Sequence, residues 1–157
     1  MIGAGLLGAV ALAVLAFWMG EAGGGFEGLF NALLGGLFLA IVAAAWRGPV
    51  WRRVWLGVGS LSLWLAAFMA GQHSAGDAFN DCVANGETVR LALAVYVKQH
   101  GTYPVTLAEL PGPLPCERLL RPSLLHYRLT NGGYELGFGD AMVQFMASES
   151  EVFEARK

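Results

Sequence analysis

The chain has 157 residues, of which 55% are apolar and only 14% are charged. Because an average soluble domain carries about 25% charged residues, this composition favours a protein whose solvent is partly lipid. The formal net charge of −2 offers no basic face for nucleic acid. The glycines follow no three-residue period, which excludes a collagen-like fibre.

The charged residues are unevenly distributed along the chain. Residues 1–71 contain three basic and two acidic residues, whereas residues 72–157 contain the other seven basic and ten acidic ones. The composition changes near the Gly71–Gly76 stretch. The sequence therefore predicts a membrane domain at 1–71 and a small polar domain at 72–157.

Three apolar segments, at about 2–20, 28–46 and 54–71, have the length of membrane spans. A helix of about 20 apolar residues crosses the hydrocarbon core and satisfies its own backbone hydrogen bonds there. No Lys or Arg precedes the first segment, whereas a cleaved signal peptide normally begins with a basic region. We therefore expect the first segment to be an uncleaved span of a three-helix transmembrane bundle.

The loops between these segments differ in charge. The second loop carries Arg47, Arg52 and Arg53, and the first carries Glu21 and Glu27. The positive-inside rule places the arginine loop and the N-terminus in the cytoplasm. With three spans, residues 72–157 then lie outside. In a bacterial inner membrane, the localisation that we expect, this domain is periplasmic or extracellular.

The second segment has a small residue at every fourth position. These residues are Gly28, Ala32, Gly36, Ala40 and Ala44. Such spacing lines one helix face with small side chains and lets another helix approach closely. The partner is either another helix of this chain or another integral membrane protein. No ionisable residue lies within the three segments, which argues against a transporter or pump acting alone.

The polar domain begins with a predicted helix at 77–100. Val89, Leu93, Tyr96 and Val97 form an apolar stripe at helical spacing. Gly101 is a typical helix stop. The third apolar segment either runs straight into this helix or is separated from it by a hinge at Gly71–Gly76.

After the helix, the sequence predicts a corner and then strands. Thr106 and Glu109 have the spacing of a capping box, so a short helix is expected at about 107–110. Residues 124–140 alternate around an Asn-Gly turn as a β-hairpin does. Residues 141–147 resemble a third strand, and the last ten residues are either an edge strand or a charged tail. The predicted fold class is therefore α+β, with a long helix packed on an antiparallel sheet of three or four strands.

Residues 86–140 resemble the globular part of type IV pilin-like proteins and type II secretion pseudopilins. That pattern has an amphipathic helix, a Gly-x-Tyr-Pro corner, a leucine-containing turn and a β-meander ending near Gly-x-Asp. The matching residues are Tyr96, Gly101, Tyr103, Pro104, Leu107, Leu110, Tyr127, Tyr134, Leu136, Gly139 and Asp140. The resemblance implies a pilin-like fold for the polar domain.

The membrane half differs from that family. A pilin has one N-terminal apolar helix, which is cut after a glycine and carries Glu at the fifth mature position. Here Gly25-Phe26 is the nearest match to the cut, and the fifth residue counted from Phe26 is Phe30. The motif for prepilin cleavage is therefore absent, and the resemblance concerns the fold more than the function.

The two cysteines, Cys82 and Cys116, both fall in the predicted outer domain. An oxidising compartment favours a disulfide between them. The alternative is a pair of free, buried thiols. A redox pair is disfavoured because the sequence contains no C-x-x-C motif.

No catalytic, cofactor-binding or metal-binding constellation is found in the sequence. His73, His100 and His126 stand apart from one another, and none has a zinc-like spacing with a carboxylate. No nucleophile-elbow, phosphate-loop or dinucleotide-binding motif occurs outside a span. We therefore expect no enzyme activity, no cofactor and no small-molecule substrate.

Three hypotheses for the function follow. The first is a structural or accessory subunit of a respiratory, photosynthetic or secretion-type membrane complex, with other integral membrane proteins and the bilayer as partners. The second is a pseudopilin-related component of secretion or pilus machinery. The third, a membrane redox or haem protein using His73 or the cysteines, has the least support.

Overall fold

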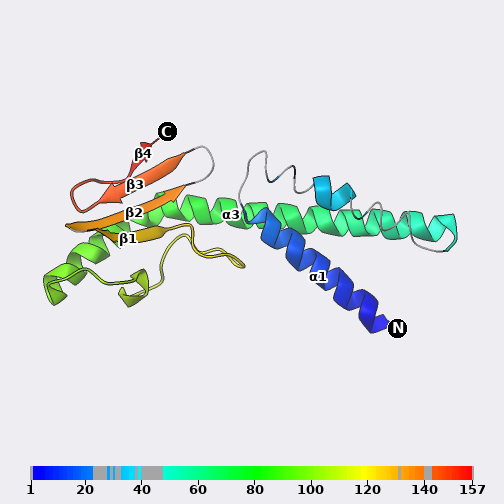
Figure 1. Cartoon of the computed structure of the whole chain (residues 1–157), viewed down its shortest axis with the longest axis horizontal. Helices are drawn as coiled ribbons and strands as arrows, with labels where there is room; N and C mark the ends of the chain where they lie inside the picture. Colours follow the sequence, from blue (N-terminus) through cyan, green and yellow to red (C-terminus); the bar gives the residue numbers. More distant parts are fainter. Residues whose placement is uncertain are drawn as a thin grey trace. The chain divides into compact units, whose positions relative to one another are not determined.

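The computed structural model describes residues 2–22, 28, 30, 33–37, 39, 48–130, 132–139 and 143–156. The chain divides into two compact units, Met1–Ala75 (unit 1) and Gly76–Lys157 (unit 2). The fold is α+β: it combines a long helix with a small antiparallel sheet (Figure 1).

Unit 1 contains helix α1 (Ile2–Gly20) and the first half of helix α3 (Val50–His100). Among the described residues, α3 is the helix that is long and apolar enough to cross a membrane, and α1 offers a shorter apolar stretch, Leu7–Gly20. Most of the predicted second span at 28–46 lies outside the described residues. The described part of the chain thus contains one candidate span and not a bundle of three.

The two helices of unit 1 share a small apolar core. Ala16 of α1 is buried with Trp64 and Phe68 of α3, and Leu12 and Met19 pack around them. The buried positions on α3 are four residues apart, one helical turn. The rest of that half of α3 leaves most of its side chains exposed.

Helix α3 has no break at Gly71–Gly76, so the predicted hinge does not form and the alternative of one continuous helix is correct. Beyond residue 75 the helix buries one stripe, with Cys82, Val89 and Leu93 facing the core of unit 2. Tyr96 packs at its edge. The predicted apolar stripe is therefore confirmed, and its 3.6-residue period explains why a helix forms here.

The sheet has four strands in the order β1-β2-β3-β4, all antiparallel (Figure 1). They are β1 (His126–Thr130), β2 (Gly133–Gly139), β3 (Gln144–Ser148) and β4 (Glu154–Arg156). The predicted hairpin and third strand are confirmed, and part of the last ten residues is an edge strand. Leu136 and Phe138 of β2 and Ala147 of β3 are buried. One face of the sheet therefore closes the core against α3, and the other remains open to solvent.

A tight corner connects α3 to the sheet. Gly101 ends the helix with a φ of 77°, a left-handed conformation that glycine adopts without strain. Pro104 is fully buried, and its carbonyl accepts a 2.8 Å hydrogen bond from the Tyr127 hydroxyl. A short 3-10 helix, Leu107–Glu109, follows. The backbone N–H of Thr106 donates to Oε1 of Glu109 at 2.9 Å, as the predicted capping box requires.

Candidate functional site

The backbones of the two helices of unit 1 come into close contact at Gly20 of α1 and Gly71 of α3. A Cβ added at Gly20 would lie 3.0 Å from the Cα of Gly71, and a Cβ at Gly71 would lie 3.0 Å from the Cα of Gly20. Each would also overlap a backbone carbonyl oxygen of the other helix, that of Phe68 or of Phe17. Only glycine at both positions permits this backbone contact, which is the geometry by which helices pack in lipid.

A buried carboxylate lies next to this crossing. Glu21 is 0% exposed. One of its oxygens, Oε1, accepts a 2.8 Å hydrogen bond from the Ser74 hydroxyl of α3. Because a buried charge without partners is costly, this bond ties the end of α1 to α3 just beyond the glycine contact. Glu21 was predicted in an acidic loop, and it is instead part of the helix contact.

The small-residue face predicted on the second apolar segment lies only partly within the described residues. Gly28 and Gly36 are described, whereas Ala32, Ala40 and Ala44 are not. A Cβ at Gly36 would lie 3.2 Å from Cδ1 of Leu61, and one at Gly35 would overlap the indole ring of Trp64. Gly35 and Gly36 therefore face α3 of this chain. For this part of the small-residue face, the partner is another helix of the same chain.

Much of α3 in unit 1 has no partner within the described chain. Trp55 is 58% exposed, Val58 52% and Leu65 44%. Other large apolar side chains between residues 50 and 69 are exposed too, including Trp51, Val54, Leu61 and Met69. An apolar surface of this kind on a water-soluble helix would be strongly unfavourable.

Unit 2 contains the predicted disulfide. Cys82 of α3 and Cys116 of the loop before β1 are bonded, with Cα atoms 4.9 Å apart and a sequence separation of 34. Both residues are buried. Cys116 has a φ of 71°, unusual for a residue other than glycine. Its backbone N–H donates to Oδ2 of Asp81 at 2.8 Å. The disulfide and this hydrogen bond together attach the loop to α3.

Tyrosines gather where the corner meets the sheet. The rings of Tyr103 and Tyr134 meet edge to face with centroids 5.1 Å apart, and Tyr127 lies beside Tyr134. Burial, assisted by a hydrogen bond to Glu149, raises the pKa of Tyr103 to about 12. Burial also raises the pKa of Tyr134. These hydroxyls stay neutral at physiological pH, so the cluster is suited to packing and hydrogen bonding.

The three histidines lie on different parts of the two units. His100 stacks on Tyr96 with ring centroids 4.1 Å apart, and its Nδ1 lies 3.1 Å from the Tyr96 carbonyl oxygen at the end of α3. His126 is exposed on β1, and His73 is exposed on α3 in unit 1. The described residues contain no group of three or more His, Cys, Asp and Glu side chains that could hold a metal ion.

In comparisons with protein families, curated proteins and solved structures, no match to this chain was found.

Sequence reasoning missed the residues that hold the helices of unit 1 together, above all Gly20, Gly71, Glu21 and Ser74. One signal was available: Gly20 and Gly71 end the first and third apolar segments, at equivalent places. No local pattern, however, shows that Glu21 and Ser74 meet, because they are 53 residues apart in the chain.

Proposed function

We propose that the protein is a non-catalytic, membrane-anchored subunit of a larger membrane protein assembly. The carrying observation is the exposed apolar surface of α3 between residues 50 and 69, which no described part of the chain covers. In this proposal the surface faces lipid on one side and a partner protein on the other. The first and third apolar segments, and the second as predicted from sequence, form the anchor.

The residues at the start of α3 support the same proposal. Trp51 and Trp55 lie near the start of α3, where Arg52 and Arg53 precede the apolar stretch. Indole rings favour the membrane interface, and arginines favour the cytoplasmic side. Unit 2 then lies outside, in a compartment where the Cys82–Cys116 disulfide is stable.

The test of this proposal is purification of the native assembly. The full chain would carry a C-terminal tag, be extracted in mild detergent and be run on a native gel. We expect one defined complex with a partner at a fixed ratio. A chain that migrates alone, with no stoichiometric partner, would contradict the proposal.

Two bulky substitutions separate lipid contact from protein contact. Val58→Trp and Leu65→Trp keep the helix apolar but change its shape. Because fluid lipid adapts to shape whereas a packed interface does not, we expect one of them to lower recovery of the partner while both variants remain in the membrane. Gly59→Ala is the matched control, since a Cβ at Gly59 meets nothing within 4 Å.

A second candidate function is a pseudopilin-related component of secretion or pilus machinery. The observation that favours it is that the apolar helix α3 continues without a break under a four-stranded antiparallel sheet. Tyr103 and Pro104 form the corner that the resemblance led us to expect, whereas Asp140 lies outside the described residues. Recovery of a processed chain with a methylated Phe26 would favour this candidate over the first.

A further inference from the structure

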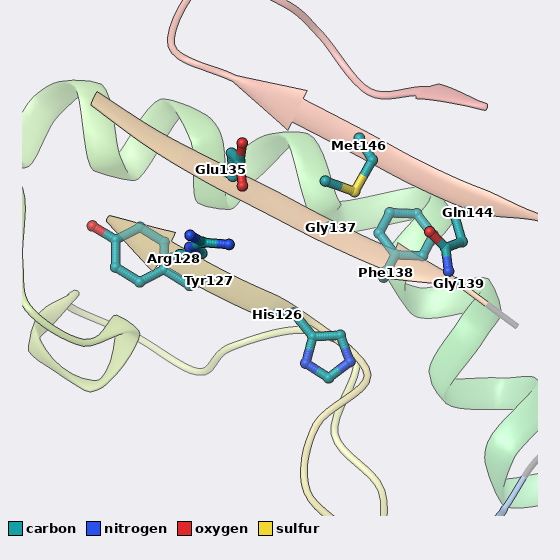
Figure 2. A pocket seen from close by; sticks show the side chains of 9 residues that line it. All are labelled: His126, Tyr127, Arg128, Glu135, Gly137, Phe138, Gly139, Gln144 and Met146. Carbon is teal, nitrogen blue, oxygen red and sulfur yellow. The ribbon is translucent and has the colours of Figure 1, made fainter. Parts of the chain in front are cut away.

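The face of the sheet turned away from the core carries a groove of about 270 Å³ that the proposed function does not use (Figure 2). His126 and Arg128 of β1 form one side of the groove, and Gln144 and Met146 of β3 form the other. Glu135 of β2 lies near one end. All of these residues lie within unit 2.

Glycine forms the floor of this groove. In the sheet register, Gly137 of β2 lies between His126 of β1 and Met146 of β3. Figure 2 shows Met146 reaching over β2 beside Gly137. A Cβ at Gly137 would lie 2.6 Å from Sδ of Met146, so a larger residue would displace this side chain. The floor is therefore apolar, because the thioether of Met146 lies over the buried Gly137.

The rim of the groove is polar and carries both signs of charge. Arg128 and Glu135 are direct partners in the β1–β2 register. Within the described chain, however, these two side chains form no ion pair with each other. His126 and Gln144 are exposed further along the groove, His126 next to Gly137 and Gln144 next to Gly139 in the register. Hydrogen-bond donors and acceptors thus alternate around an apolar floor, and both kinds are open to a ligand.

This pattern selects among ligand classes. A simple anion would be attracted by Arg128 but repelled by Glu135, and a simple cation would meet the reverse. An extended peptide lying on the face of a sheet finds the backbone groups already used in the ladder, and so loses the main source of affinity of strand addition. A hydroxyl group donates and accepts, so a polyol satisfies both charged groups at once. The C–H face of a sugar ring also fits an apolar floor.

We propose that this groove binds a saccharide, with Arg128 and Glu135 hydrogen-bonding its hydroxyl groups and Gly137 and Met146 supporting one ring face. The groove is comparable in size with the smaller ligand sites of proteins, which begin at about 300 Å³. It therefore accommodates a short oligosaccharide segment of one or two units. The proposal does not depend on the membrane partner proposed above.

The test uses the methionine methyl groups of the full chain. The sequence contains five Met residues, so selective ¹³C-methyl labelling gives few signals, and Met146→Leu identifies the Met146 signal. The chain would be placed in phospholipid nanodiscs, because detergents with sugar headgroups would compete. The probes are chitotriose, maltotriose and inorganic phosphate. We expect at least one trisaccharide at millimolar concentration to shift the Met146 signal saturably, while the Met19 and Met69 signals stay fixed.

Matched variants show whether the rim makes the contacts. Arg128→Gln and Glu135→Gln each remove one charged hydrogen-bond partner from an exposed position, and each should weaken binding about tenfold. Thr130→Ala, on the same strand and the same face but outside the groove, should leave binding unchanged. A Met146 signal that stays close to its wild-type position without ligand shows that unit 2 is folded in each variant.

Three results would overturn the proposal. The first is that neither trisaccharide moves the Met146 signal. The second is that phosphate moves this signal and the sugars do not, which would make the groove an anion site. The third is a shift of equal affinity in wild type, Arg128→Gln and Glu135→Gln, which would show that the sugar contacts another surface.

Discussion

A few individual polar contacts in this protein join segments that are distant in the chain. Asp81 is an example, because its Oδ1 accepts from Asn85 at 2.7 Å and its Oδ2 accepts from the backbone of Cys116 at 2.8 Å. The capping box of Thr106 and Glu109 and the pairing of Cys82 with Cys116 could be predicted from sequence. The first depends on local spacing, and the second on there being only two cysteines. The partners of Asp81 and Glu21 could not be predicted, because only the folded chain brings them together.

The disulfide should contribute a large part of the stability of unit 2. Closing a loop with a sequence separation of 34 contributes roughly 3 to 4 kcal/mol in the chain-entropy description. We expect Cys82→Ser with Cys116→Ser to lower the free energy of unfolding by about that amount. Urea unfolding of the full chain in nanodiscs, monitored by tyrosine fluorescence with and without reductant, measures the effect. Reductant should destabilise the wild type and leave the double variant unchanged. An equal effect on both would show that the disulfide is not the source.

Tyr103 should make unit 2 sensitive to high pH. Its pKa in the folded chain is raised to about 12, above the ordinary tyrosine value of 10.0, so the unfolded chain loses this proton first as pH rises. The stability linked to Tyr103 is therefore fully present below about pH 10 and is lost progressively towards about pH 12. We expect the free energy of unfolding to fall less steeply over this range in Tyr103→Phe than in wild type. Parallel slopes in the two proteins would contradict this assignment.

At the scale of elements, the close approach of two helices depends on glycines, which have no side chain. The sequence predicted the apolar stripe of the helix in unit 2, the hairpin and the capped turn, because each of these has its own period or turn residues. The sequence did not predict that Gly20 and Gly71 meet. They belong to different apolar segments, and neither segment's own pattern determines where the two helices cross. The sequence left open a hinge at Gly71–Gly76. In the structure this stretch belongs to a continuous helix, and Gly71 contacts α1.

The glycine crossing gives a sharp prediction for unit 1. Gly71→Leu should separate α1 from α3, because even its Cβ would overlap the carbonyl oxygen of Phe17. The native cysteines are joined to each other, so spin labels can be attached at Gly8→Cys and Gly59→Cys, where a Cβ meets nothing within 4 Å. We expect Gly71→Leu to broaden and lengthen the distance distribution between the labels. Gly76→Leu, which also has an open Cβ position, is the control and should leave the distribution narrow.

For the whole molecule, the sequence predicted the α+β class and an antiparallel sheet of three or four strands, and the structure has four. Composition alone also predicts the division into a membrane domain at 1–71 and a polar domain at 72–157, because lipid and water select different residues. The number of spans is a different matter. It depends on residues 28–46, most of which lie outside the described chain, so the three-span topology stays a prediction. So does the side of the membrane on which unit 2 lies.

The orientation can be tested with two single introduced cysteines, one at the start of α3 and one on β1 of unit 2. The proposed topology puts the arginine-rich start of the helix in the cytoplasm and unit 2 outside, since basic loops are retained inside. Arg52 and Thr130 are both exposed, so Arg52→Cys and Thr130→Cys should tolerate labelling. In intact cells, a membrane-impermeant maleimide should label Thr130→Cys and spare Arg52→Cys. After lysis both should react, which controls for reactivity. Labelling of Arg52→Cys alone before lysis would reverse the topology, and equal labelling of both would mean that α3 does not span the membrane.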